Sequence, residues 1–183
     1  DYQMIADGDR IAVAVSGGKD SLTLLRVLQA RQRVAQERYD LVAVHVVAEE
    51  AACGRGTDRD LLEAYLAGQG VELVMVPLPI PSGQPKRVNQ SPCFHCAWRR
   101  RKEIFQAAER LGCQKVAFGH HADDLAETAL LNLFFHGKVE TMEPRLSFFD
   151  GKLIVIRPLA YIQEKEIIRF ARTAGFPPPP PTC

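Results

Sequence analysis

The chain has 183 residues, of which 46% are hydrophobic and 25% are charged, and this balance is typical of a globular domain rather than a disordered or fibrous chain. A net charge of +1 argues against a protein that coats nucleic acid, although a local basic face would suffice to bind one. No secretory signal and no long apolar run stand out, so we expect a cytoplasmic protein without contact to a membrane. Because the chain starts at Asp1 and stops after a proline run, we also expect a piece of a longer protein.

Short apolar runs rich in β-branched residues alternate with helix-like stretches along the chain. We expect a single domain, 1–183, with an α/β fold: a parallel five-stranded sheet with helices on both faces. Ligands bind such sheets beyond the carboxyl ends of the strands. The expected strands are 10–15, 40–48, 71–78, 114–119 and 152–156; the expected helices are 19–38, 57–68, 96–111, 122–135 and 163–174; a cysteine-bearing loop covers 79–97, and a proline-rich polyproline II segment covers 176–183.

The first strand runs directly into Ser-Gly-Gly-Lys-Asp-Ser. Two glycines let the backbone turn sharply and expose its N–H groups, and the helix that follows adds the positive end of its dipole. The motif lacks the glycine and the Lys-Ser/Thr pair of common nucleoside-triphosphate loops, because Val13 and Asp20 stand in those places. A simple turn that starts a helix is the plainer alternative. The candidate phosphate-binding residues are Ser16, Gly17, Gly18, Lys19, Asp20 and Ser21.

Five cysteines in a chain of intracellular character point to metal binding or catalysis rather than to disulfides. Cys93 and Cys96 form a Cys-x-x-Cys pair at the start of a predicted helix, a spacing that lets two thiolates reach one metal. No second pair completes a zinc site, although His95 or Cys113 could stand in. An iron–sulfur cluster needs further cysteines, and Cys183 is a candidate third ligand. Composition alone leaves zinc and iron–sulfur equally open.

The stretch "GHHADD" follows the fourth expected strand, and its side chains would face the Gly-Gly turn if the first and fourth strands are neighbours. Asp123 and Asp124 can handle protons or a metal ion, or they can cap the helix that follows. Four basic residues, 99–102, follow the cysteine pair; such a run either covers a solvated face or contacts RNA phosphates. Arg157 is a second candidate for such a contact. Phe94 and Trp98 could stack a flipped base, but core packing is their expected role.

Together these motifs resemble the PP-loop ATPases of the adenine nucleotide alpha hydrolase type, and among them the family of tRNA 2-thiocytidine biosynthesis proteins. The resemblance covers nearly the whole chain in order. It rests on "MIADGDRIAVAVSGGKDSLTLL", "CFHC" followed by arginines, "GHHADD", "GKLIVIRPLAY" and a cysteine after "GFPPPPPT".

The resemblance implies an ATP-dependent transferase that adenylates C2 of an anticodon-loop cytidine in tRNA and then replaces the oxygen with sulfur. Asp20 would hold Mg²⁺, and Asp124 would be catalytic. Arg100 stands where some related thiolases have a catalytic lysine; it keeps the charge but is a poor base. Val46 and His120 would line the nucleotide site. A [4Fe-4S] cluster on Cys93, Cys96 and Cys183 would leave one iron free to bind sulfide.

Implied partners are tRNA, a sulfur donor that is either a cysteine desulfurase or free sulfide, and a second copy in a homodimer. Two alternatives stay open from the sequence. A lysidine synthetase activates a tRNA cytidine in the same way but attaches lysine and needs no cluster. A nucleotide-binding module with a structural zinc site would bind ATP without releasing pyrophosphate.

Overall fold

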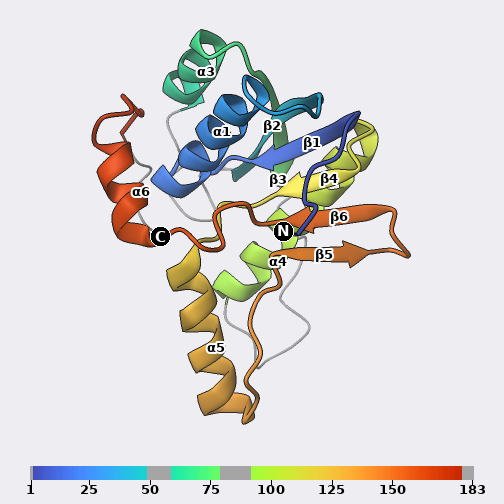
Figure 1. Ribbon diagram of the computed structural model, residues 1–183, viewed down its shortest axis with the longest axis vertical. Helices are drawn as coiled ribbons and strands as arrows, with labels where there is room; N and C mark the ends of the chain where they lie inside the picture. Colours follow the sequence, from blue (N-terminus) through green and yellow to red (C-terminus); the bar gives the residue numbers. More distant parts are fainter. Residues whose placement is uncertain (1, 49–58, 79–91, 179–183) are drawn as a thin grey trace.

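The computed structural model describes residues 2–48, 59–78 and 92–178, and it has the expected α/β class (Figure 1). Within these residues the fold is a central sheet with helices against it and one helix, α5, that extends away from it (Figure 1). The strands are β1 Asp9–Ala14, β2 Tyr39–Ala48, β3 Glu72–Leu78, β4 Lys115–Ala117, β5 Arg145–Phe148 and β6 Leu153–Ile156; the helices are α1 Lys19–Gln32, α3 Arg59–Gly68, α4 Pro92–Arg110, α5 Ala122–His136 and α6 Glu164–Ala171.

The sheet has six strands in the order β3-β2-β1-β4-β6-β5, so the prediction of five strands was one short. All neighbours pair in parallel except β5, which runs antiparallel to β6 at the edge. The missed strand is four residues long and only half-buried, and it gives little apolar signal. Its hairpin turns through Phe149, Asp150 and Gly151, which all have a positive φ, and the Asp-Gly pair in that turn is a hairpin signal that the strand prediction left unused.

Two helix boundaries differ from the predictions. The helix α1 ends at Gln32, six residues before the predicted end. The helix α4 begins at Pro92, so Cys93 and Cys96 lie inside a helix and not in a loop that runs to residue 97. Proline is favoured in the first helical turn, where its missing N–H has no partner to lose. Most of the predicted cysteine-bearing loop, 79–91, and the end of the proline-rich segment, 179–183, lie outside the described residues.

Two apolar clusters cover the two faces of the sheet. The side chains of Ile11, Val13 and Val15 face the cluster built with α1, α3 and α6. Ala12 and Ala14 face the other cluster, which includes the buried residues of α4. Since successive residues of a strand point to opposite faces, β1 is buried on both sides. This double burial fixes the point where β1 ends and the Gly-Gly turn begins.

The amino-terminal edge of the sheet contains a buried ion pair between Lys115 and Asp9, whose side chains are 6% and 12% exposed. Asp9 also accepts a hydrogen bond from the backbone N–H of Ala6. No helix among the described residues is long and apolar enough to cross a membrane.

Removing the buried partner of Lys115 should destabilise the fold. We expect Asp9→Asn to lower the free energy of unfolding by about 3 kcal/mol, because it leaves a buried ammonium without its counter-charge. Urea denaturation followed by circular dichroism measures this. The matched control is Glu72→Gln in the exposed pair with Arg10, where the loss should stay below about 1 kcal/mol. Equal losses in the two variants would contradict the assignment.

Candidate functional site

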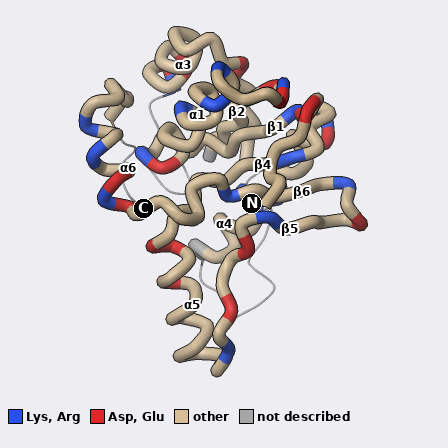
Figure 2. The backbone as a smooth tube through the Cα atoms, viewed as in Figure 1, with Lys and Arg blue, Asp and Glu red and all other residues tan. Residues whose placement is uncertain are grey.

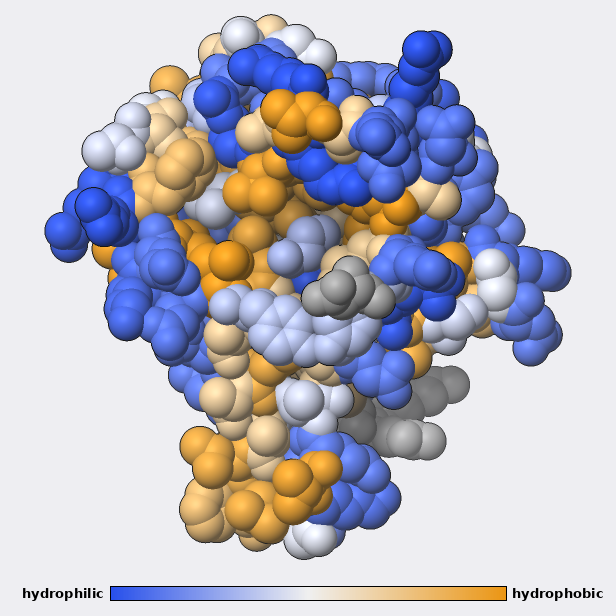
Figure 3. Space-filling model, viewed as in Figure 1, coloured by the Kyte–Doolittle hydropathy of each residue, from blue (hydrophilic) through white to orange (hydrophobic). Residues whose placement is uncertain are grey.

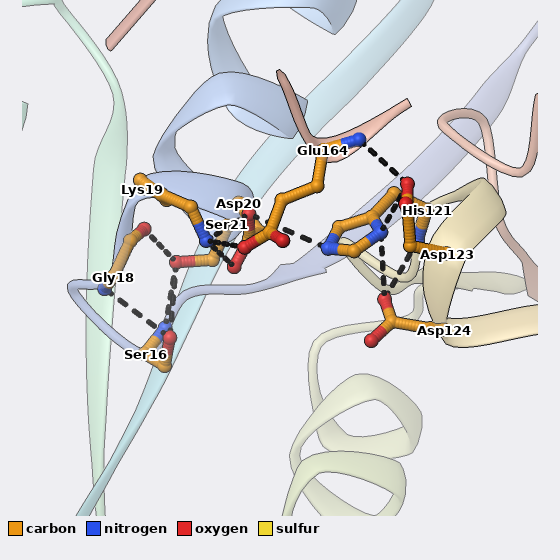
Figure 4. Close-up of polar contacts among 9 residues, drawn as sticks. All are labelled: Ser16, Gly18, Lys19, Asp20, Ser21, His121, Asp123, Asp124 and Glu164. Atoms are coloured by element: carbon orange, nitrogen blue, oxygen red, sulfur yellow. Dashed lines mark hydrogen bonds and ion pairs between the residues drawn. The ribbon is translucent and has the colours of Figure 1, made fainter. Parts of the chain in front are cut away.

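The turn between β1 and α1 is a compact loop held by its own polar groups (Figure 4). The backbone N–H of Ser16 donates to Ser21 Oγ at 3.1 Å, and that hydroxyl donates to the carbonyl of Gly18 at 2.9 Å. The N–H of Gly18 donates to Ser16 Oγ at 3.3 Å. Gly17 has a φ of +86°, a backbone conformation that residues with a side chain rarely adopt. The two serines therefore set the shape of the loop, and the glycine makes the bend possible.

The first turn of α1 begins without a side-chain cap. Its N-cap is Gly18, which has no side chain to accept a hydrogen bond from the first-turn N–H groups. A helix start leaves several N–H groups without intrahelical partners, and they carry the positive end of the dipole. Ser, Thr, Asp or Asn at this position would fill that place with an oxygen of its own. A phosphate group fits the uncapped helix end without displacing any side-chain cap.

The end of β4 lies directly against this loop. The strands β1 and β4 are neighbours in the sheet. This was the condition under which "GHHADD" would face the Gly-Gly turn. A Cβ placed on Gly119 would come within 3.0 Å of the backbone C and O of Asp20. Glycine allows this approach without a shift of the backbone, and the approach brings the start of α5 to the start of α1.

His121 links the two helix starts. Its side chain is 7% exposed, its Nε2 lies 3.8 Å from Asp20 Oδ1, and its Nδ1 lies 3.5 Å from Asp124 Oδ2. The backbone N–H of His121 donates to the same Asp124 oxygen at 2.8 Å, so this carboxylate caps α5. The capping role weighed for Asp124 is thus confirmed, and its catalytic role stays a prediction (Figure 4).

Glu164 at the start of α6 lies beside this loop, although no sequence motif pointed to it. Its Oε1 lies 2.8 Å from Lys19 Nζ, which is also 3.0 Å from Asp20 Oδ1. The N–H of Glu164 donates to Asp123 Oδ2 at 2.7 Å. Partial burial lowers the pKa of Lys19, but the hydrogen bonds with Glu164 and Asp20 raise it by more, so the ammonium is held charged. Hydrogen bonding to Lys19 in turn lowers the pKa of Glu164.

His120 and Arg157 form a second, more buried pair beside the loop. The Arg157 side chain donates from Nε to His120 Nδ1 at 3.2 Å and from Nη1 to the carbonyl of Glu143. The His120 ring stacks on Phe118 with centroids 5.6 Å apart. Burial, followed by the charge of Arg157, lowers the pKa of His120 to about 4. His120 is therefore a neutral imidazole whose Nδ1 accepts and whose Nε2 carries the proton.

The cysteines are only partly covered by the described residues. Cys96 is half-buried in the second turn of α4, whereas the side chain of Cys93 and all of Cys53 and Cys183 lie outside the described part. Cys113 is 4% exposed in the core, and burial raises the pKa of its thiol, which matches a small apolar core residue. Within the described ranges no cluster of three His, Cys, Asp or Glu side chains is arranged to hold a metal ion.

The remaining candidates lie on α4 and β2. Arg100 is half-buried and its Nε has no hydrogen-bond partner among the described atoms, while Arg101 and Lys102 are exposed. Phe94 and Trp98 are 52% and 57% exposed, so the expectation that they pack in the core was wrong. They occupy the outer side of the helix start, where no sheet covers them. Val46 is buried near the carboxyl end of β2, on the same edge of the sheet as the loop.

A family model described as a PP-loop domain matches residues 2–177. The chain belongs to the PP-loop family. The tRNA-cytidine(32) 2-sulfurtransferase of Geobacter sulfurreducens is 44% identical to it over 179 residues, 97% of this chain and 68% of that protein. The protein of the same name from Cupriavidus necator is 42% identical over 179 residues, 97% of this chain and 56% of that protein. This PP-loop chain thus spans little more than half to two thirds of the length of these two relatives.

Two solved structures have a fold similar to that of this chain. The U34-tRNA thiolase NcsA from Methanococcus maripaludis with its [4Fe-4S] cluster superposes with a TM-score of 0.75 at 23% identity, over 100% of this chain and 63% of that one. A phosphoadenylyl-sulfate reductase from Candida auris, in complex with phosphate, superposes with a TM-score of 0.53 at 10% identity, over 91% of this chain and 73% of that one. At these identities the likeness establishes the fold.

The lowered pKa of His120 predicts how the stability of the fold depends on pH. An unfolded histidine titrates near 6.5, so between about pH 6.5 and 4 the unfolded chain binds a proton that the folded chain refuses. Stability should therefore be full above pH 6.5 and fall by up to about 3 kcal/mol toward pH 4. NMR titration of the ring C2–H should show no change down to about pH 5. Arg157→Gln should raise the pKa of His120, and the matched Arg101→Gln should raise it less. A His120 ring that titrates near 6.5 in the native protein would contradict the buried, neutral assignment.

Proposed function

We propose that this PP-loop protein is the ATP-dependent part of a tRNA sulfurtransferase that converts an anticodon-loop cytidine to 2-thiocytidine. The observation that carries the proposal is the uncapped start of α1 facing the His121–Asp124 segment across the end of the sheet. An enzyme that adenylates a base needs a pyrophosphate site and, beside it, groups that handle a proton or a metal. Two relatives at 42–44% identity, named tRNA-cytidine(32) 2-sulfurtransferases, support the choice of reaction and substrate.

The loop residues would bind the β- and γ-phosphates of ATP. First-turn N–H groups of α1 donate to phosphate oxygens, and Lys19 exchanges Glu164 for phosphate as its anionic partner. Asp20 would hold Mg²⁺ together with the phosphates, because that cation takes one or two carboxylates and keeps its other positions for phosphate and water. The adenine would lie at the carboxyl end of β2, near Val46. His120 offers its fixed Nε2–H as a donor beside the same site.

The reaction would proceed in two displacements. The C2 oxygen of cytidine attacks the α-phosphorus of ATP, the bond to the β-phosphate breaks, and pyrophosphate leaves. Sulfide then attacks C2, and AMP leaves with the former C2 oxygen, so that sulfur replaces oxygen without a change of redox state. Arg100 would stabilise the negative charge that develops at C2, since an arginine stays charged and cannot serve as the base. Asp124 would accept the proton that hydrosulfide loses when its sulfur attacks C2.

The ligands of the cluster remain a prediction. Cys93, Cys96 and Cys183 would hold a [4Fe-4S] cluster, which when bound supplies an open iron for sulfide. Positions 93 and 96 are three residues apart in α4 and so share a helix face. A solved thiolase with the same fold is described with such a cluster. A cytoplasmic location, a cysteine desulfurase or free sulfide as sulfur donor, and a homodimer follow from the family resemblance and stay predictions as well.

Sulfur incorporation into tRNA tests the proposal. Protein purified without oxygen should contain iron and acid-labile sulfide. With ATP, Mg²⁺, sulfide and unmodified tRNA it should form 2-thiocytidine together with AMP and pyrophosphate, detected by nucleoside mass spectrometry. Cys93→Ala should abolish the product, and Asp124→Asn should reduce it by at least about 100-fold. Cys113→Ala, which alters a buried cysteine away from the pair, is the matched control.

Other results would replace this function with another. AMP release that depends on lysine, with iron-free protein, would indicate a lysidine synthetase. ATP binding without pyrophosphate release, in protein that contains zinc, would indicate a nucleotide-binding module. An active Cys93→Ala variant would remove the cluster from the mechanism.

A further inference from the structure

The described part of the chain buries one lysine and one arginine, and they differ in their counter-charge. Lys115 is 5% exposed and pairs with Asp9. Arg157, the first residue after β6, is 7% exposed, and no carboxylate within residues 2–48, 59–78 and 92–178 forms an ion pair with it. A charge that is withdrawn from water without a partner of opposite sign is costly. The position of Arg157 would therefore be stabilised by an anion.

The hydrogen bonds of Arg157 hold the side chain in place without neutralising it. Its Nε donates to His120 Nδ1 at 3.2 Å, and its Nη1 donates to the carbonyl of Glu143. Both acceptors are uncharged, because the lowered pKa of His120 keeps the imidazole neutral. The nearby carboxylate of Asp124 accepts the N–H that caps α5. Nη2 has no hydrogen-bond partner among the described residues and can donate to a further acceptor.

A second arginine lies beside Arg157. Arg101 is exposed on α4, and, after burial, its charge is the next cause that lowers the pKa of Arg157. The packing of α4 explains this proximity: Phe105 contacts Phe118 with ring centroids 6.3 Å apart, and Phe118 stacks on His120 at 5.6 Å. Residues four apart in a helix share a face, so Arg101 lies one turn from Phe105 on the same side. Two positive charges placed together repel each other, and an anion between them relieves this repulsion.

The same face of α4 also presents an aromatic ring. Trp98 lies three residues before Arg101 and is 57% exposed. Unpaired RNA bases stack on exposed aromatic rings, and the phosphates between the bases pair with arginines. An exposed indole next to two arginines without carboxylate partners therefore matches the chemistry of single-stranded RNA.

The other large exposed surface lacks this combination. The space-filling view in Figure 3 shows apolar residues gathered over the far half of α5. No charged residue occurs from 128 to 135, so this part of the helix has nothing to pair with a phosphate (Figure 2).

We infer that Arg157 and Arg101 form a second anion site, separate from the Gly-Gly loop, which binds a backbone phosphate of the RNA substrate while Trp98 stacks on an unpaired base beside it. This assignment rests on the proposed function, whose substrate is an RNA loop. The strands β1, β4 and β6 are parallel neighbours, so the site lies at the same edge of the sheet as the loop. Neighbouring strands are about 4.8 Å apart, which puts the ends of β6 and β1 about 10 Å apart. The loop and the second site can thus hold different phosphates at the same time.

The fluorescence of Trp98 tests the site without any reaction. An unmodified anticodon stem-loop RNA, added to the full chain without ATP, should quench this single tryptophan, because a base stacks on the indole. Arg101→Gln should raise the dissociation constant of the RNA by about tenfold and reduce the salt slope of binding by about 1. The matched control is Arg110→Gln, which removes the same charge at the far end of α4 and should change the dissociation constant by less than about twofold.

The buried member of the site is tested by Arg157→Gln. This variant should also weaken RNA binding by at least about tenfold, whereas the affinity for an ATP analogue should stay the same in all three variants. Circular dichroism shows whether Arg157→Gln folds, and if it does not, the exposed Arg101 decides.

Three results would overturn the inference. They are RNA affinity that Arg101→Gln leaves unchanged, Trp98 fluorescence that does not respond to saturating RNA, and an Arg101→Gln variant that loses affinity for the ATP analogue but not for RNA. The last result would assign the site to the phosphates of the nucleotide. Formation of 2-thiocytidine together with any of these results would disprove the second site and leave the proposed function standing. RNA binding that depends on Arg101, in a protein that forms no 2-thiocytidine, would support the site and disprove the reaction.

Discussion

The close approach of Gly119 to the backbone of Asp20 is the constraint on which the rest of the site depends. The strands β1 and β4 pair in parallel, so their carboxyl ends reach the same edge of the sheet. A Cβ at position 119 would meet the backbone C and O of Asp20 at 3.0 Å, so one of the two segments would have to shift by a few tenths of an ångström. Without that Cβ, the starts of α1 and α5 face each other, and His121 spans the distance between Asp20 and Asp124. Two segments that are a hundred residues apart in the chain form one site because of this contact.

The charges of the site suit an exchange of anions. Lys19 is paired with two carboxylates, and one of them, Glu164, comes from a helix near the other end of the chain. Lys19 keeps its charge through this pairing, and in the proposed function a phosphate would take the place of one carboxylate. Asp123, in the first turn of α5, accepts a hydrogen bond from the backbone N–H of Glu164 and so also caps the start of α6. A nucleotide that displaces Glu164 therefore acts on the junction of three helices.

Much of this could be predicted from the sequence. The alternation of β-branched runs with helical stretches gave the class of fold, and β1 was evident because it is buried on both faces. The loop at Ser16–Ser21 and the His-Asp stretch were found from spacing alone, and their meeting required only that the first and fourth strands be neighbours. These features are local in sequence or follow from the rules of parallel sheets.

Other features depend on contacts that no local pattern announces. Glu164 sits in an ordinary helix start, "QEKE", and only the packing of α6 beside α1 brings it to Lys19. The edge strand β5 is short and half exposed, and the exposure of Trp98 depends on which face of α4 meets the sheet.

The central claim is that the uncapped start of α1 binds the pyrophosphate portion of ATP. A crystal structure of the protein with a non-hydrolysable ATP analogue and Mg²⁺ tests it most directly. The account predicts density for the β- and γ-phosphates against the N–H groups of residues 17–21, with Lys19 turned from Glu164 to a phosphate oxygen. An analogue bound elsewhere, with the Lys19–Glu164 pair intact and the helix start open to solvent, would contradict it.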